Sequence, residues 1–595
     1  MNFDYFVLPF TIGLGILTSV LLYTFIMWIV KIEKTERQKI GKGIFTVKTL
    51  EAIKEVFLES LIHRKIFKRN PLLGFMHASL AFGWFLLIVV GDIEVKYHNS
   101  GGFKAPYYPV FFKFFEKAPG DFAGATIFPH VMDALLLLVL TGVALALFKR
   151  VRSSIYGLRK TTRLRLGDKL ALYSLWLIFP ARLLAESISS GLHGTGGFLT
   201  GSLGRALQSL DALAYMEHPA WWLYSSALGV FFVALPFSRY MHIPTEVLLI
   251  FLRKYGIRTR KYYASISEVE VYSCSRCGMC IDRCQLPDAG ITSPISVYFI
   301  RSVRNNSLDS KTLYNCMMCG RCTEACPVGI DVNALRTAKR EEFNIKNKFT
   351  YDFEKPAVTS SPKVLYFAGC MGHLTPGVIK SMQNIFDAAG ENYWFMDQEK
   401  GVCCGRPLMM AGQHNAALQL VNHNRAIINQ SKATLLVTSC PICYNVFKQK
   451  YNLKIRVMHH TEYINQLVNQ GRISVGQLPL SAVYHDPCEL GRACEVYDEP
   501  RQLLQNILTL KGSSEEREKS PCCGGSLGNF EIQAPQRDQI RDKALDVLMA
   551  QDPDMLVTAC PACKRTFAKG RTDVVVKDIA EVVNEVLVVH KNTYN

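Results

Sequence analysis

The sequence predicts a multidomain fold: an all-α bundle of five membrane-spanning helices, then a mainly helical cysteine-rich domain, then two repeated α/β domains. Three observations predict this order. Five apolar runs of about twenty residues stand in the first half of the 595-residue chain, all 19 cysteines follow residue 273, and a cysteine pattern near the C-terminus occurs twice. The expected domains are residues 1–252, 265–348, 362–475 and 480–590.

The five apolar runs are long enough to cross a bilayer as helices. They cover residues 7–30, 72–90, 127–148, 170–188 and 221–237. The first is longer than the apolar part of a cleavable signal, and basic residues follow rather than precede it, so we expect it to remain in the mature protein. The lipid bilayer is therefore an expected partner of residues 1–252.

The basic residues of the connections predict the orientation. Connections 31–70, 149–169 and 238–263 hold 11, 8 and 6 Lys and Arg, whereas connections 91–126 and 189–220 hold 4 and 1. This places the N-terminus outside and the cysteine-rich half in the cytoplasm. The same distribution accounts for much of the net charge of +18. Because no nucleic-acid-binding motif accompanies that charge, we expect no nucleic-acid partner.

Histidines near the ends of the runs suggest a haem. His77 and His242 fall at the same depth, near the cytoplasmic ends of the second and fifth runs. A b-type haem held between two helices needs imidazoles that face each other in this way. The alternative is a histidine bonded to a neighbouring helix and an interfacial one. At the outer side, His130 and His218 could ligate a second haem or lie in surface loops.

The five runs and their histidines resemble the cytochrome b subunits of respiratory nitrate reductase and membrane-bound heterodisulfide reductase. That resemblance implies haem b between His77 and His242. The family usually has a second pair, with the fifth-span histidines eighteen residues apart, but that spacing leads here to Tyr224. The expected haem number is therefore one, or two if His130 and His218 replace the outer pair.

Two cysteine quartets of the form C-x2-C-x2-C-x3-C follow the membrane part. In two-cluster ferredoxins the fourth cysteine of each quartet ligates the cluster of the other quartet. The spacing therefore predicts two cubane [4Fe-4S] clusters, one on Cys274, Cys277, Cys280 and Cys326, the other on Cys316, Cys319, Cys322 and Cys284. Zinc prefers four ligands in two short pairs, and disulfides are disfavoured in the cytoplasm.

The last third of the chain contains an internal repeat. VLYFAGC at 364–370, CCG at 403–405 and LVTSCPIC at 436–443 match AVYHDPC at 482–488, CCG at 522–524 and LVTACPAC at 556–563. Each copy begins with a β-rich run and ends with a second one that leads into a helix start, which predicts a small α/β domain. A thiol at a helix N-terminus has a lowered pKa and so favours metal ligation.

This spacing resembles the CCG domains of heterodisulfide reductase catalytic subunits. The resemblance implies a non-cubane [4Fe-4S] cluster in each complete set of five cysteines. The first set is Cys370, Cys403, Cys404, Cys440 and Cys443, and the second is Cys488, Cys522, Cys523, Cys560 and Cys563. Either both repeats hold clusters or one is a scaffold. Cys494 is left over, and we expect it to be a buried free thiol.

A cytochrome, a two-cluster ferredoxin and two CCG repeats in one chain resemble the bacterial membrane-bound electron-transfer-flavoprotein:menaquinone oxidoreductases. The resemblance implies a protein of the bacterial inner membrane. It would pass electrons from reduced electron-transfer flavoprotein, or another cytoplasmic donor, through the clusters and haem b to menaquinone. Consistent with a separate donor, the chain has no glycine-rich nucleotide loop and no flavin fingerprint.

Two other functions remain open on the sequence. One is a quinol-linked disulfide reductase, in which a non-cubane cluster cleaves a disulfide. The other is a non-catalytic electron conduit within a larger respiratory complex.

Overall fold

The computed structural model describes residues 3–98, 104–117, 125–152, 164–259, 266–344, 362–399 and 402–588. The chain divides into two compact units. Unit 1 is Met1–Asp282 with Pro327–Ile330, and unit 2 is Arg283–Cys326 with Asp331–Asn595. The segment expected to form one ferredoxin domain, 265–348, is thus divided between them. The units are described separately below.

Unit 1 is helical and contains the apolar runs. Four helices are long and apolar enough to cross a membrane: α1 Leu8–Lys31 with the preceding turn, α5 Pro71–His98, α7 Phe128–Val151 and α8 Leu166–His193. The fifth run lies in α10 Leu213–Ala234, which is followed after a 78° bend by η4 Arg239–Met241 and α11 His242–Lys254. The described residues therefore offer four spans, or five if the bent pair counts as one.

The fifth predicted span differs most from the observed helix. Residues 221–237 were expected, whereas α10 begins at Leu213 and ends at Ala234. The end has a local cause, because Pro236 follows two residues later and a helix usually ends before a proline. The turn after it places His242 at the first position of α11.

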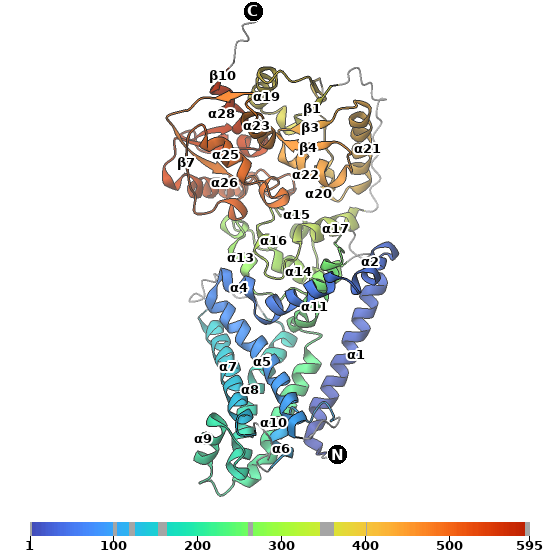
Figure 1. Ribbon diagram of the computed structural model, residues 1–595, viewed down its shortest axis with the longest axis vertical. Helices are drawn as coiled ribbons and strands as arrows, with labels where there is room; N and C mark the ends of the chain where they lie inside the picture. The colour runs from blue at the N-terminus through green and yellow to red at the C-terminus, as the bar shows by residue number, and fades with distance from the viewer. Residues whose placement is uncertain are drawn as a thin grey trace, which may run out of the picture. The chain divides into compact units, whose positions relative to one another are not determined.

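The long helices of unit 1 pack in pairs. α8 packs along α10, α5 along α7, and α1 along α10, as Figure 1 shows for the lower part of the picture. Their core contains Phe179, Trp221 and Phe231, each no more than 1% exposed. α1 approaches α10 closely where Gly13 faces Gly229, since a Cβ added to Gly13 would lie 2.8 Å from the Gly229 backbone.

Shorter helices complete unit 1. On the side of the cysteines, α2 Lys34–Ile44, α3 Val47–Val56, the π-helical turn η2 Phe57–Leu61 and α4 Arg64–Arg69 connect α1 to α5. At the other end lie α6 Phe112–Phe115 and α9 Phe198–Leu207 (Figure 1). The cysteine segment of unit 1 contributes α12 Ser267–Tyr272 and α13 Met279–Asp282.

Unit 2 begins with short helices around the second cysteine quartet. These are η5 Leu286–Ala289, α14 Ser296–Arg304, α15 Ser310–Tyr314, α16 Arg321–Ala325 and α17 Val332–Asn344.

Each repeat forms a four-stranded parallel sheet with the same strand order. In the first repeat the order is β2-β1-β3-β4, made by β1 Val364–Phe367, β2 Tyr393–Phe395, β3 Leu435–Thr438 and β4 Arg456–His459. In the second it is β7-β6-β8-β9, made by β6 Ser481–His485, β7 Thr509–Lys511, β8 Met555–Thr558 and β9 Val575–Asp578. The two copies expected from the cysteine pattern therefore also have the same strand order and strand direction.

Helices follow the strands in both sheets. The first repeat has α18 Gly369–Gly372, α19 Pro376–Ala388, α20 Arg406–Ala411, α21 His414–Gln430, α22 Pro441–Lys450 and α23 His460–Asn469. The second has α24 Gly491–Cys494, α25 Asp498–Gln505, η6 Arg517–Lys519, α26 Ala534–Leu548, η7 Met549–Gln551, α27 Pro561–Ala568 and α28 Ile579–Glu585.

The two repeats share one hydrophobic core. Tyr366, Phe386 and Tyr463 of the first repeat pack in the same buried cluster as Leu503 and Val583 of the second. A short antiparallel strand pair also joins the two repeats: β5 Ser474–Val475 pairs with β10 Leu587–Val588. The repeats are therefore two sheets of one body rather than independent domains.

The Gly13–Gly229 approach predicts which glycine of α1 is needed for packing. We expect Gly13→Leu to destabilise the protein by roughly 1–3 kcal/mol, because the added side chain must push α1 and α10 apart. Gly15→Leu is the matched control, since a Cβ at Gly15 meets no atom within 4 Å. Thermal unfolding in detergent measures both variants, and an equal loss in the two would contradict the packing argument.

Candidate metal centres

The cysteines of the first repeat lie at the carboxyl-terminal edge of its parallel sheet, at the point where the strand order reverses. Cys370 follows β1, Cys403 and Cys404 follow β2, and Cys440 and Cys443 follow β3. β1 lies between β2 and β3, and parallel strands bring their carboxyl ends to the same edge. In sheets of this kind ligands bind outside that edge, at the point where the strand order reverses. Five cysteines far apart in sequence are thereby gathered at one place.

Two local features fix the loop after β1. Buried Asp397 accepts hydrogen bonds from the backbone N–H of Ala368 at 2.9 Å and of Gly369 at 2.8 Å. Gly369 has a φ of +75°, and a Cβ at this position would lie 2.8 Å from the Cys443 sulfur. The close approach of backbone and sulfur therefore requires glycine beside Cys370.

The five thiols of the first repeat contact one another in a chain. Cys370 and Cys404 donate to the sulfur of Cys403, and Cys443 donates to the sulfurs of Cys404 and Cys440. These hydrogen bonds lower the pKa of Cys403 to about 3, and the bond from Cys443 lowers the pKa of Cys440. Cys440 also precedes the first residue of α22, where a helix N-terminus favours a thiolate.

The second repeat has the same series of thiol contacts with one change. Cys522 donates to Cys523, and Cys563 donates to Cys523 and Cys560, so the bonds to Cys523 lower its pKa. The sulfur that donates to Cys522, however, is Cys319 of the second quartet. Cys488, the counterpart of Cys370, lies within electrostatic range of Cys522 and Cys319. The second set of thiols is therefore in direct contact with a cysteine expected to ligate a cubane.

Both sets fit the chemistry of an iron–sulfur cluster. In the described ranges no three or more His, Cys, Asp or Glu side chains are grouped to hold a single metal ion, and the sulfurs instead make pairwise contacts. Soft thiolates are the ligands that such clusters use. Cys494 has no place in either set; burial raises its pKa to about 12, and it packs against the shared core of the repeats.

The second quartet is assembled within unit 2. The sulfur of Cys284 lies within electrostatic range of Cys316, Cys319 and Cys322. The turn between these cysteines passes through left-handed backbone at Met318, with φ +50°, and Gly320, with φ +79°. The structure thus brings together the four residues predicted for this cubane.

The first quartet belongs mainly to unit 1. Cys274, Cys277 and Cys280 lie there, whereas Cys326 belongs to unit 2, so the ligation of Cys326 to the first cluster stays a prediction. The turn repeats that of the second quartet, with φ +55° at Arg276 and +92° at Gly278.

A buried ion pair ties the first quartet to the membrane helices. Arg276 donates to Asp168 at 2.6 Å, and both side chains are less than 10% exposed. The other oxygen of Asp168 accepts from the backbone N–H of Arg239 at 2.7 Å, three residues before His242. Asp168, near the start of α8, therefore links the loop of Cys277 to the turn that positions His242.

The histidines expected to hold a haem lie in the same region. His77 on α5 is half-buried, and its buried Nε2 atom has no hydrogen-bond partner in the described part of the chain. An orphaned ring nitrogen is what an axial haem ligand presents. His242 lies within electrostatic range of His77, and its Nδ1 contacts the carbonyl of Arg239 at 2.7 Å. A second ring nitrogen held in this way is typical of a metal-ligating histidine.

His63 is a third imidazole that the sequence analysis missed. Its ring stacks on that of His77, with centroids 5.4 Å apart. It has a left-handed backbone with φ +59°, and burial lowers its pKa. No apolar run contains His63, so only its unusual position between α3 and α5 could have drawn attention to it.

The structure gives the outer histidines other roles. His218 is exposed and pairs with Asp4 at 2.9 Å, and exposed His130 stacks on Phe198. Tyr224, at the position of the missing family histidine, is buried beside Trp221 and Phe111. Aromatic side chains fill this position and the two histidines face outward, so their surroundings do not favour a second haem.

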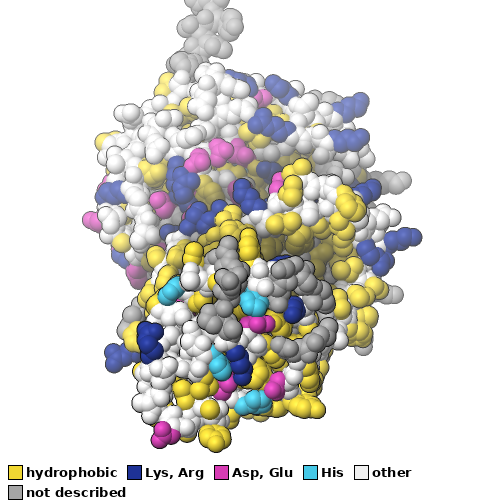
Figure 2. Space-filling model, turned by 60° about the horizontal axis from the view of Figure 1, so that its bottom comes forward, with side chains coloured by type: hydrophobic (Ala, Val, Ile, Leu, Met, Phe, Trp, Pro, Cys, Tyr) yellow, Lys and Arg dark blue, Asp and Glu magenta, His cyan; other side chains and the backbone are white. Residues whose placement is uncertain are grey.

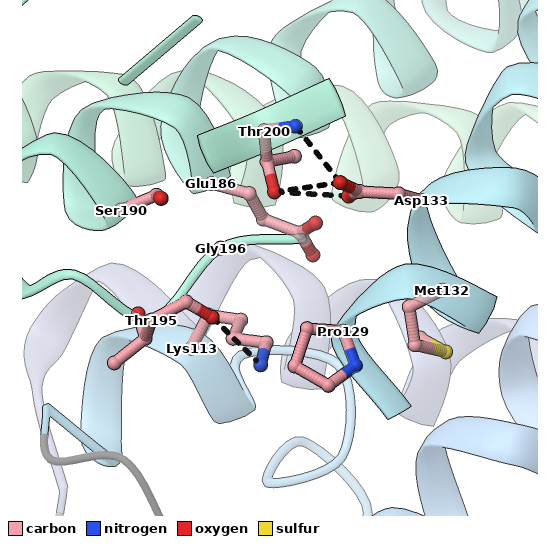
Figure 3. A pocket seen from close by; sticks show the side chains of 9 residues that line it. All are labelled: Lys113, Pro129, Met132, Asp133, Glu186, Ser190, Thr195, Gly196 and Thr200. Atoms are coloured by element: carbon pink, nitrogen blue, oxygen red, sulfur yellow. Dashed lines mark hydrogen bonds between the residues drawn. The ribbon is translucent and has the colours of Figure 1, made fainter. Parts of the chain in front are cut away.

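A small polar pocket lies at the end of the bundle that carries α6 and α9. Figure 3 shows Glu186 and Asp133 reaching toward it from α8 and α7, with Lys113 on the opposite side. Asp133 accepts from the backbone and hydroxyl of Thr200, and Glu186 pairs with Arg182 at 2.8 Å. In Figure 2 this end carries histidine, acidic and basic side chains between hydrophobic ones. The Arg182–Glu186 pair thus has the structural role of joining successive turns of α8.

Family models match the cysteine-rich parts of the chain. A 4Fe-4S dicluster domain matches residues 270–330, and a cysteine-rich domain of the CCG type matches residues 364–448 and 482–568. The chain therefore combines an iron–sulfur dicluster segment, two CCG repeats and a helical region with four or five apolar helices.

Individual relatives match different shares of the chain. An EtfAB:quinone oxidoreductase of Syntrophomonas wolfei is 23% identical over 87% of this chain and 88% of its own length. One component of the dihydromethanophenazine:CoB–CoM heterodisulfide reductase of Methanosarcina mazei is 30% identical over 38% of this chain and 59% of its own length. An uncharacterised iron–sulfur protein of Methanococcus maripaludis is 30% identical over 55% of this chain and 64% of its own length.

These matches confirm the resemblance drawn from the cysteine motifs. The chain is similar both to an electron-transfer-flavoprotein:quinone oxidoreductase and to heterodisulfide reductase subunits. It spans only about 60% of the length of the Methanococcus and Methanosarcina relatives.

The thiol contacts of the first repeat predict that Cys443 is needed to hold iron, whereas Cys494 is not. We expect Cys443→Ser to lose about four iron atoms per chain, the content of one [4Fe-4S] cluster, because Cys443 contacts both Cys404 and Cys440. Cys494→Ser is the matched control and should keep all iron. Iron and sulfide analysis of anaerobically purified protein measures both, and equal iron in the two variants would show that this set holds no cluster.

The positions of His63, His77 and His242 predict which substitutions remove a bound haem. We expect His77→Ala and His242→Ala to abolish the absorption spectrum of a b-type haem, and His63→Ala to retain it with shifted bands. His130→Ala should leave the spectrum unchanged, because that side chain is exposed. Retention in His242→Ala together with loss in His63→Ala would instead identify His63 as the partner of His77.

Proposed function

We propose that this protein is a membrane-bound oxidoreductase that passes electrons from reduced electron-transfer flavoprotein to menaquinone. The observation that carries the proposal is the direct contact between a CCG thiol, Cys522, and a ferredoxin thiol, Cys319. It gives electrons a short path between two kinds of cluster. The similarity to an EtfAB:quinone oxidoreductase over most of both chains supports the donor and the acceptor.

The residues of the chain would hold the redox groups in order. Cubane and non-cubane clusters and haem b supply one-electron transfer when bound. The two sets of five cysteines would hold non-cubane clusters, the two quartets cubanes, and His77 and His242 the haem. Asp168 and Arg276 fix the first quartet beside the membrane helices, and Lys149 lies within electrostatic range of both His77 and Cys277. This proximity supports a haem next to the first cubane.

The membrane topology forms part of the same proposal. The protein would lie in the bacterial inner membrane with the N-terminus outside and the iron–sulfur part in the cytoplasm. The basic connections of unit 1 support this orientation. The cytoplasmic position would give the flavoprotein access to the CCG repeats, and the bundle would deliver electrons to quinone in the bilayer.

A second candidate is a quinol-linked disulfide reductase. The similarity to a heterodisulfide reductase component and the two complete sets of five cysteines favour it. Electrons would then run from quinol to a disulfide substrate, and two electrons with two protons would convert the disulfide to two thiols.

One anaerobic experiment separates the two candidates. Purified protein in detergent is mixed with electron-transfer flavoprotein reduced by an acyl-CoA dehydrogenase, and haem reduction is followed by absorbance before and after addition of a menaquinone analogue. We expect rapid haem reduction followed by reoxidation by the quinone. The Cys443→Ser variant should slow the first step at least tenfold while leaving haem reduction by dithionite intact.

The opposite result would favour the second candidate. If the flavoprotein leaves the haem oxidised, while a small disulfide rapidly oxidises the dithionite-reduced protein, the protein is a disulfide reductase. Flavoprotein mixed with haem-free protein from the His77→Ala variant provides the background rate.

A further inference from the structure

Two buried arginines and one half-buried arginine lie beside the second quartet in unit 2. Arg336 and Arg340 on α17 are fully buried as residues, and Arg492 on α24 is partly buried. Arg336 lies within electrostatic range of Cys322, Arg340 of Cys316, and Arg492 of Cys319, Cys488 and Cys522. The three guanidinium groups therefore surround the site predicted for the cubane of Cys284, Cys316, Cys319 and Cys322.

These arginines bond to neutral groups. Arg336 donates to the carbonyls of Thr312, Leu313 and Pro294 and lies 4.0 Å from the centre of the Phe299 ring. Arg340 donates to the carbonyls of Leu313, Tyr314, Met410 and Gly528 and to the Met318 sulfur. Among the described residues, no carboxylate forms an ion pair with either.

Arg492 joins the quartet to the second repeat. Its Nε donates to the carbonyl of Cys319 at 2.8 Å, and its Nη1 donates to the carbonyls of Glu518 at 3.2 Å and Ser520 at 2.7 Å. Its Nη2 is buried and has no hydrogen-bond partner in the described ranges, and the same is true of Nε of Arg336. Two donors are thus left for a group that the bonded residues do not supply.

A buried cation without a counter-ion is strongly unfavourable, so an anion is expected within reach. The cysteines of the quartet, with the cluster they would hold, are the group that all three arginines share, although Glu531 also lies within electrostatic range of Arg340. The first repeat differs here, because Leu374 occupies the position equivalent to Arg492 and is exposed. Its half-buried Arg406, which lies near Cys404 and Cys488, is neutralised by Glu489 at 3.0 Å.

We propose that Arg492, together with Arg336 and Arg340, raises the reduction potential of the cubane at Cys284, Cys316, Cys319 and Cys322, and so makes it the electron acceptor of the second CCG site. The proposal rests on the proposed function for the presence of the clusters. It makes the two repeats unequal: the second is the junction to the ferredoxin clusters, and the first exchanges electrons through the second.

The physical reason is the charge of the reduced cluster. One added electron increases the negative charge of the cluster by one, and a buried guanidinium stabilises that charge more than the oxidised state. Removal of the guanidinium therefore disfavours the reduced cluster. The contact between Cys319 and Cys522 provides the path, and the arginines provide the direction of transfer.

The test is a redox titration of the intact protein followed by EPR. The signal of this cubane is identified as the one that the Cys322→Ala variant loses. We expect Arg492→Gln to shift the one-electron equilibrium of that signal toward the oxidised form by at least tenfold, which corresponds to about 59 mV. Arg492→Lys, which keeps the charge, should shift it by less than half as much. Dithionite is the reductant, so the result does not depend on the flavoprotein.

Arg537→Gln is the matched control, because it removes an arginine from an exposed position of the same repeat, where water screens the charge. Should Arg492→Gln lose iron, Arg340→Gln is titrated in its place and must show a shift in the same direction. Shifts no larger than that of Arg537→Gln, or equal shifts in Arg492→Gln and Arg492→Lys, would overturn the proposal. If Arg492→Gln shows the expected shift but the flavoprotein does not reduce the protein, the effect of the arginines on the cubane stands. Only the proposed electron donor is then refuted.

Discussion

The convergence of strand ends is the constraint on which the cysteine sites of the repeats depend. Thiolates that must share one cluster come from three separate segments in each repeat, and only parallel pairing brings the ends of those segments together. In the first repeat, β1 stands between β2 and β3, so the loops after all three strands meet at one edge. The tight turns at Gly369 and Gly405 are consequences of this crowding, because each must let backbone approach sulfur or a neighbouring helix.

Duplication of this arrangement has not produced two equivalent sites. The repeats share a core, yet the first thiol contact of the chain is made by Cys370 in one and by Cys319, from another part of the chain, in the other. The half-buried arginine near each also differs in its partner: a carboxylate for Arg406 and carbonyl groups for Arg492. Symmetry of fold is thus combined with asymmetry of charge, which suits a path along which electrons pass in sequence.

Much of the architecture follows from local sequence. Apolar length predicted the long helices, and cysteine spacing predicted the second quartet, because short turns such as that at Met318 fix the spacing of its ligands. Three features were not predictable in this way. The stacking of His63 on His77, the contact of Cys319 with Cys522, and the pairing of Asp168 with Arg276 join segments distant in sequence. Their partners are chosen by packing, which no single-segment pattern records. His130 and His218 show the same limit, because spacing does not say which face of a helix is buried and both side chains are exposed.

Asp168 also has a consequence for biogenesis. One carboxylate near the start of α8 receives the backbone of Arg239, after α10, and the side chain of Arg276, beside Cys277. The loop of the first quartet can gain this anchor only after the chain around α8 and α10 has been inserted and packed. We therefore expect folding of α8 and of the turn after α10 to precede completion of the loop at Cys277.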